Sequence, residues 1–231
     1  MILNPLLILA GGRATRLGDL SEKTPKFLMP IDSKTVFADL QLEWAAAQGF
    51  QKVILSVGYL GEKIQNYCQD GKRWGLDISY SFDGPVALGT GGAVKKALKG
   101  MGQSAAVTYG DTLLALNAAD LFNKAQGSEA FMTVYKNKVS GHVCNAHIAG
   151  DSVQYSKSQP RKDFLFIDYG FLILSPNFVG QIPDSTPLDL ALPLEKLSDA
   201  GRLKGCEIHD RFWEMGSLES LEDFKKRYAK V

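Results

Sequence analysis

Apolar residues in the first half of the chain occur alternately as short continuous runs and as stripes at helical spacing. The runs are rich in Val, Ile, Leu and Ala, which is typical of parallel strands buried on both faces. Strands are predicted at residues 6–10, 53–57, 77–82 and 105–109. Helices are predicted at residues 36–48, 62–68 and 91–98, the first with Phe37, Leu40 and Trp44 on one stripe. This alternation predicts an open sheet with helices on both faces.

The second half of the chain has more strands and less helix between them. Strands are predicted at residues 130–135, 142–148, 153–155 and 164–174, with a last edge strand at 207–211. The proline-rich residues 183–193 are predicted to be irregular before a helix at 194–200. A closing helix follows Ser217, its predicted N-cap, with an apolar stripe of Leu218, Leu221, Phe224 and Tyr228. The predicted fold class is α/β: a Rossmann-like, open, mixed and mostly parallel sheet flanked by helices, in a single domain over residues 1–231.

The composition is that of a chain that fills one large α/β domain and carries almost no net charge. Of its 231 residues, 45% are hydrophobic and 22% charged, and the formal net charge is +1. A net charge this small provides no global attraction to nucleic acid or to an anionic membrane. Any phosphate site must therefore be built locally, and no nucleic-acid partner is expected.

Cysteine usage and the N-terminus bear on the compartment. Cys68, Cys144 and Cys206 are isolated in the sequence and form no C-x-x-C pair, which favours a reducing environment. The apolar run at residues 5–10 is too short to span a membrane and lacks the basic start of a signal peptide. These features predict a cytoplasmic protein with no membrane partner.

The segment with the clearest chemistry reads LILAGGRATRL over residues 7–17. Gly11 and Gly12 let the backbone approach a ligand closely and expose its N–H groups. A hydroxyl, a guanidinium and an ammonium group, all suited to phosphate oxygens, follow at Thr15, Arg16 and Lys26. Both G-x-G-x-x-G and G-x-x-x-x-G-K-[ST] are absent, so the glycine spacing disfavours an NAD-dependent oxidoreductase and a P-loop.

This loop, with the Pro-Lys pair at residues 25–26, resembles the signature of the sugar-1-phosphate nucleotidyltransferases. Those enzymes join a nucleoside triphosphate to a sugar 1-phosphate and release pyrophosphate, so the resemblance implies these two partners. It implies catalytic roles for Arg16, on the departing pyrophosphate, and for Lys26, near the α-phosphate. Ala14 stands where the family usually has Gly. The resemblance implies nucleotide binding by Leu9, Ala10, Gly11, Gly12, Arg13 and Thr15.

Two acidic residues are the candidates for a metal site. Asp111 follows a predicted strand at the edge where open α/β sheets bind ligands. Glu214, in the segment FWEMGS at residues 212–217, matches a late family element in which Asp is more usual. Carboxylate and phosphate oxygens are the ligands that Mg²⁺ prefers. The resemblance therefore implies Mg²⁺ as cofactor, with Glu214 binding it directly or through water.

Further segments are candidates for contacts with the nucleoside and the sugar. The turn LGTGGA at residues 88–93 opens a helix whose free N–H groups suit an anion or a base edge, which makes Gly89 and Thr90 nucleotide candidates. The resemblance implies a sugar-phosphate role for Lys157. Further sugar-side candidates are Asn145, Asp168 and Gly170.

Several alternatives stay open. A zinc site at His142, Cys144 and His147 is disfavoured because His147 points to the other face of a strand and no fourth ligand is evident. Likeness to short guanylyltransferases favours GTP with a mannose- or heptose-type 1-phosphate. A UTP- or CTP-dependent enzyme, a catalytically weak nucleotide-sugar-binding regulatory protein and a homo-oligomer remain possible readings.

Overall fold

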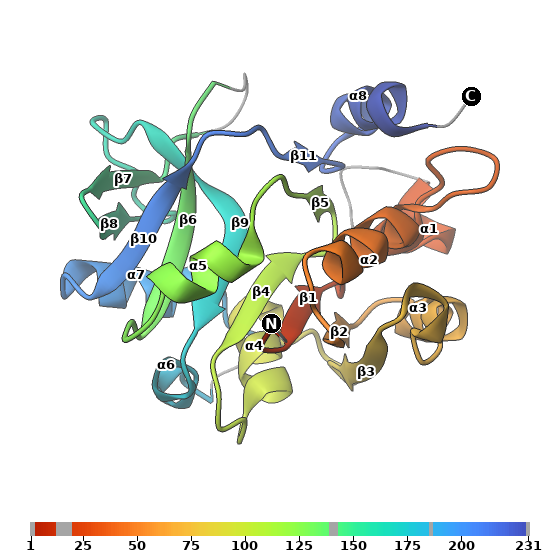
Figure 1. Ribbon diagram of the computed structural model, residues 1–231, viewed down its shortest axis with the longest axis horizontal. Coiled ribbons are helices and arrows are strands. Elements are labelled where there is room, and N and C mark those ends of the chain that lie inside the picture. Colours follow the sequence, from red (N-terminus) through yellow and green to blue (C-terminus); the bar gives the residue numbers. More distant parts are fainter. Residues whose placement is uncertain (1–2, 13–19, 139–142, 185–186, 230–231) are drawn as a thin grey trace. The chain divides into compact units, whose positions relative to one another are not determined.

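The computed structural model describes residues 3–12, 20–138, 143–184 and 187–229 (Figure 1). They divide into two compact units, each assembled from separate stretches of the chain. The first unit takes residues 1–87, 108–114 and 212–231, and the second takes residues 88–107 and 115–211. The end of the chain thus returns to the unit in which the chain begins.

The first unit is built on a parallel sheet. Ile8 lies opposite Leu55, and Leu55 lies opposite Tyr80. The order is β3-β2-β1, followed by β4, whose last residues belong to this unit. These strands are β1 (Leu6–Leu9), β2 (Lys52–Val57), β3 (Asp77–Phe82) and β4 (Ala105–Tyr109). The antiparallel pair is β5 (Thr112–Leu113) and β11 (Trp213–Glu214). The helices are α1 (Leu20–Lys23), η2 (Lys26–Leu28), α2 (Phe37–Ala47), α3 (Gly61–Cys68), η3 (Lys72–Trp74) and α8 (Leu218–Tyr228).

An aromatic cluster fixes the C-terminal helix to the first unit. Phe37 on α2 lies between Phe27 and Phe224, with ring centroids 6.4 and 5.4 Å apart. All three rings are almost completely buried, and each contributes roughly 1.5–3 kcal/mol through burial. As predicted, Ser217 is the N-cap of α8, because its hydroxyl accepts a hydrogen bond from Ser220 N at 3.2 Å. The strand that carries Glu214 is thereby tied to the unit that carries Lys26.

The second unit holds a mixed sheet. The order is β9-β6-β10-β8-β7, with β4 beside β9 and an additional pairing of β7 with β9 (Figure 1). β6 and β10 run parallel, whereas the other pairings among β6 to β10 are antiparallel. The strands are β6 (Ala130–Lys136), β7 (Ala146–Ala149), β8 (Ser152–Tyr155), β9 (Phe166–Leu174) and β10 (Leu203–Ile208). The helices are α4 (Gly89–Leu98), α5 (Ala118–Lys124), α6 (Pro176–Gln181) and α7 (Ala191–Asp199).

The mixed α/β class is confirmed, and the differences from the predicted elements have local causes. The last strand was predicted at 207–211 on an edge, which is wrong: β10 begins at Leu203 and lies between β6 and β8. Gly205 interrupts the apolar pattern there, and a β-carbon on it would collide with the backbone oxygen of Met132. Helix α7 begins inside the proline-rich segment, because Pro193 falls in its first turn, where no backbone N–H is needed.

Strand β9 contains an irregularity at a predicted site residue. Its register with β6 shifts between Met132 and Val134, and Gly170, with φ +92°, lies in the shifted stretch. Such bulges re-aim neighbouring side chains and often lie beside functional sites. Within the residues that the structure describes, no helix combines the length and apolar character needed to span a membrane.

Candidate active site

The glycine pair begins where β1 ends. The backbone before it is engaged, because Ala10 N donates to Ser56 O at 2.8 Å and Gly110 N donates to Leu9 O at 2.9 Å. A β-carbon on Gly11 would lie 3.1 Å from Gly58 N, a tight contact that favours glycine here. Gly12 is exposed, and a β-carbon there would meet nothing within 4 Å. The open backbone at Gly12 is therefore the part of the pair that can face a ligand.

Three predicted residues of the same loop, Arg13, Thr15 and Arg16, lie outside the described residues. The described chain resumes before Lys26 and is held there by two contacts. Tyr59 donates its hydroxyl to Glu22 O at 2.8 Å, and Lys63 Nζ donates to Lys23 O at 2.7 Å. Both satisfy carbonyl groups at the end of α1 that have no helical partner.

Lys26 and Asp111 form an ion pair across 85 residues of sequence. Lys26 Nζ lies 2.9 Å from Asp111 Oδ2, and the two side chains are only 19% and 27% exposed. Lys26 is the first residue of η2, in which the following Phe27 is buried. The fold therefore brings together a predicted catalytic residue and a predicted metal ligand.

A buried glutamine supports the turn that carries Asp111. Gln41, from α2, uses one amide nitrogen to donate to Tyr109 O at 2.8 Å and to Thr112 O at 2.9 Å. Thr112 in turn donates its hydroxyl to the other carboxylate oxygen of Asp111, at 3.0 Å. Sequence reasoning missed Gln41; its only signal was a polar residue within a predicted amphipathic helix.

Glu214 lies on β11, which pairs with β5, the strand that begins immediately after Asp111. Glu214 is opposite Thr112 in the β5–β11 pair, and Met215 N donates to Asp111 O at 3.0 Å. A β-carbon on Gly216 would lie 2.9 Å from Glu214 Oε2, so the glycine makes room for this carboxylate. Two carboxylates, one in the turn before β5 and one on β11, offer the oxygen ligands that Mg²⁺ prefers. Among the described residues no three His, Cys, Asp or Glu gather as a metal cluster, so such a cation would need ligands from substrate or water.

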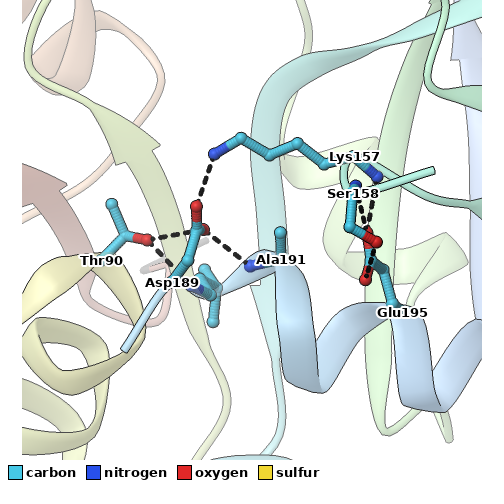
Figure 2. Close-up of polar contacts among 7 residues, drawn as sticks. Thr90, Lys157, Ser158, Asp189, Ala191 and Glu195 are labelled. Atoms are coloured by element: carbon cyan, nitrogen blue, oxygen red, sulfur yellow. Dashed lines mark hydrogen bonds and ion pairs between the residues drawn. The ribbon is translucent and has the colours of Figure 1, made fainter. Parts of the chain in front are cut away.

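In the second unit, Thr90 and Lys157 are linked through Asp189 (Figure 2). Lys157 Nζ lies 2.6 Å from Asp189 Oδ2. The other oxygen of Asp189 accepts from Thr90 Oγ1 at 3.2 Å and from Ala191 N at 3.0 Å. Burial raises the pKa of the Asp189 carboxyl, but the hydrogen bonds from Lys157, Ala191 and Thr90 and the positive charge of Lys157 together outweigh it, so the pKa lies below its usual value.

The glycine-rich turn packs against the segment that carries Asp189. Gly89 has φ +71°, and a β-carbon on it would collide with the backbone oxygen of Leu188. Gly91 N donates to this same oxygen at 2.8 Å, and Leu190 N donates to the Thr90 hydroxyl at 2.9 Å. The expectation that the N–H groups of this turn await a ligand is therefore wrong for Gly91, which packing against Leu188 already occupies.

The other sugar-side candidates lie together: Asp168 and Gly170 are on β9, and Asn145 immediately precedes β7, which pairs with β9. Asp168 N donates to Asn145 Oδ1 at 2.9 Å, and Gly170 N donates to Asp168 Oδ1 at 2.9 Å. The carbonyl of Asn145 accepts from Ser156 N at 2.9 Å, one residue before Lys157. The irregular stretch of β9 is thus stabilised by the side chain of Asp168.

Sequence reasoning missed the two carboxylates around Lys157, Asp189 and Glu195. Both lie in or beside a segment that its prolines made appear irregular. An Asp two residues before a run of helix-forming residues is a recognised helix-start signal, and it could have indicated Asp189.

A glycine pair that follows the first strand of an α/β sheet lies at the edge where such sheets bind ligands. The chain belongs to the nucleotidyl transferase family, whose model matches residues 6–142.

Individual relatives differ in the base that they use. The UTP–glucose-1-phosphate uridylyltransferase of Synechocystis is 28% identical over 215 residues, covering 84% of this chain and 55% of that protein. The D-glycero-alpha-D-manno-heptose 1-phosphate guanylyltransferase of Campylobacter jejuni is 38% identical over 115 residues, covering 50% and 51%. The chain thus spans about half the length of these curated relatives. The solved structure of HddC from Yersinia pseudotuberculosis complexed with GMP-PN has the same fold, with a TM-score of 0.80, 23% identity and coverage of 98% and 100%.

Proposed function

We propose that the protein transfers a nucleotidyl group from a nucleoside triphosphate to a sugar 1-phosphate, giving a nucleotide sugar and pyrophosphate. The observation that carries this proposal is the Lys26–Asp111 ion pair at 2.9 Å, next to Gly110, whose N–H donates to Leu9 O just before the glycine pair. The family match and the names of the relatives support it. A nucleotide sugar of this kind would serve the synthesis of cell-surface polysaccharide.

The reaction needs charge neutralisation more than proton transfer. An oxygen of the sugar phosphate attacks the α-phosphorus, and the bond from that phosphorus to the pyrophosphate oxygen breaks. The nucleophile is already an anion, so no general base is required. Two unit charges 4 Å apart repel by about 1 kcal/mol in water and about 4 kcal/mol at an effective dielectric constant of 20. Cationic groups must therefore cover the phosphates of both substrates.

The candidate residues have separate proposed roles in this chemistry. In the first unit, Lys26 would stabilise the charge that develops at the α-phosphate, and Arg16 would hold the leaving pyrophosphate. In the second unit, Lys157 would hold the phosphate of the sugar 1-phosphate, and Asn145 and Asp168 would contact sugar hydroxyls. Gly12 would present its backbone to the triphosphate, and Gly89 and Thr90 would adjoin the nucleoside.

Magnesium is the proposed cofactor, and its proposed ligands are Asp111 and Glu214. When bound, Mg²⁺ supplies positive charge to phosphate oxygens. The donor chemistry fits, since both residues offer carboxylate oxygens, and Glu214 lies opposite Thr112, the residue after Asp111.

The role of Glu214 has its own test. Glu214→Gln is expected to raise the magnesium concentration needed for half-maximal activity several-fold, because the amide is a weaker ligand than the carboxylate. Glu214→Asp is expected to retain substantial activity, since Asp is the usual family residue. The measurement is initial rate against magnesium concentration; a Glu214→Gln curve that matches wild type at limiting magnesium would show that this residue is structural.

GTP is the proposed triphosphate, supported by the likeness to the heptose 1-phosphate guanylyltransferase. We expect the largest melting shift with GTP and Mg²⁺, because stabilisation follows affinity, and the fastest pyrophosphate release with a mannose- or heptose-type 1-phosphate. The screen pairs each of the four triphosphates with mannose, glucose and heptose 1-phosphates. Faster turnover with UTP or CTP would replace the base assignment and leave the reaction class in place.

Two further points follow from the same proposal. A catalytically weak regulatory protein is the alternative, and absence of pyrophosphate release with every pair in the screen would favour it.

The cytoplasm is the proposed location, supported by the three cysteines, none of which forms a disulfide.

A further inference from the structure

Both the backbone and the ammonium group of Lys157 bond to carboxylates from residues 189–195. Its ammonium group contacts Asp189, two residues before α7, and its backbone N–H donates to Glu195 Oε1, on α7, at 2.6 Å (Figure 2). The lysine itself lies in the turn after β8 and is 56% exposed. Packing therefore does not fix this side chain, and its attachments determine where the ammonium group can lie.

The carboxylate of Glu195 accepts hydrogen bonds from three residues of the turn after β8, residues 156–158. Besides Lys157 N, it accepts from Ser158 N at 2.8 Å, from Ser158 Oγ at 2.9 Å and from Ser156 Oγ at 3.4 Å. One helical turn further along α7, Ser198 Oγ accepts from Tyr155 N at 2.8 Å. Residues 155–158 thus lie against one face of α7, because positions three apart in a helix share a face.

A lysine that binds phosphate depends on such an anchor more than an arginine does. Its ammonium is a point charge on a flexible four-carbon stem, so the direction of the stem is set by the backbone from which it starts. Without the carboxylate, the N–H groups of Lys157 and Ser158 would bond to water and the turn would sample other conformations. Hydrogen bonds to a charged carboxylate are stronger than those to a neutral acceptor, so Glu195 restrains the turn strongly.

We infer that Glu195 is a positioning residue for the sugar phosphate and that it acts through Lys157. The inference rests on the proposed function, in which Lys157 binds the phosphate of the sugar 1-phosphate. Glu195 need not touch either substrate. Its contribution is to hold the turn from which Lys157 reaches the phosphate.

The test is a double-mutant cycle of Lys157 and Glu195. The quantity measured is the KM for the sugar 1-phosphate that the enzyme uses in the substrate screen. Lys157→Ala is expected to raise this KM at least tenfold, and Glu195→Ala roughly fivefold to tenfold. The double variant should be no worse than Lys157→Ala alone, since a residue that acts through Lys157 has nothing left to position. The KM for the triphosphate should stay within twofold of wild type.

Two variants separate positioning from general structural support. Glu195→Gln should recover most of the affinity, because its amide oxygen can accept from both N–H groups and its amide nitrogen can donate to Ser158 Oγ. Asp199→Ala removes an exposed carboxylate from the same helix and should leave both KM values unchanged. Melting temperatures of all variants would be recorded alongside.

The outcomes distinguish failure of the positioning role of Glu195 from failure of the proposed function. Additive effects of Lys157→Ala and Glu195→Ala, or a Glu195→Ala variant that loses only melting temperature, would overturn the positioning role and leave the proposed function intact. A Lys157→Ala variant with wild-type KM would overturn the assignment of Lys157 and the role of Glu195 with it. A wild-type protein inactive with every substrate pair would contradict the proposed function itself.

Discussion

Lys26→Ala is expected to lower the turnover number about a hundredfold while changing triphosphate affinity far less. The ammonium group contacts Asp111, which follows Gly110, whose N–H donates to Leu9 O just before the glycine pair. In the proposed reaction, negative charge would grow on the α-phosphate near this ammonium group. Losing a contact that strengthens in the transition state typically costs about 3 kcal/mol, which is two orders of magnitude in rate. Steady-state kcat, with triphosphate affinity measured separately, is the appropriate pair of measurements.

Loss of folding must be kept apart from loss of chemistry in this variant, because Lys26→Ala also removes the partner of a largely buried Asp111. Melting temperature and circular dichroism would show whether the fold survives. Lys72→Ala is a matched control: Lys72 forms an ion pair with Asp70 at 2.6 Å, but the two side chains are 86% and 57% exposed. Exposed pairs contribute little, so this variant should keep wild-type turnover. Near-normal kcat in folded Lys26→Ala would remove Lys26 from the catalytic machinery.

The local part of the site could be predicted from the sequence, because it is written in neighbouring residues. An apolar run followed by Gly11 and Gly12 predicts a strand that ends in an open loop, and the structure places β1 and the pair accordingly. Gly11 illustrates the limit of such reasoning. A β-carbon on Gly11 would press against the backbone of Gly58, 47 positions further along the chain, and no local pattern indicates that contact.

Partners that come from distant elements could not be predicted. The pairing of Lys26 with Asp111 joins residues 85 positions apart, and Gln41 reaches the same turn from a helix whose pattern predicts only a buried face. Asp189 and Glu195 were hidden for another reason. Proline at the third position of α7 is compatible with a helix, yet in the sequence it signals an irregular segment. These side chains orient the predicted residues, and the fold alone brings them into place.

Asp111→Asn is expected to remove magnesium-dependent activity, lowering kcat by two to three orders of magnitude, without unfolding the protein. Asn has nearly the same shape, and its oxygen can still accept the hydrogen bond from Thr112 Oγ1 that Asp111 accepts at 3.0 Å. It has no negative charge for a cation, and its amide nitrogen cannot accept from Lys26. A metal ion that stabilises transition-state charge contributes several kcal/mol, which corresponds to that loss in rate.

The measurement is activity across a magnesium titration, with circular dichroism and melting temperature on the same samples. Asp70→Asn is the matched control. Like Asp111, Asp70 forms an ion pair with a lysine, but it is exposed and is remote in sequence from the candidate site. It should follow the wild-type magnesium curve. If folded Asp111→Asn followed that curve as well, Asp111 would be a turn residue that serves only to hold Lys26, and the proposed metal site would have to be abandoned. If Asp111→Asn loses activity at every magnesium concentration and Glu214→Gln raises the magnesium requirement, the two carboxylates act on one cation, in keeping with the pairing of Glu214 with the residue after Asp111.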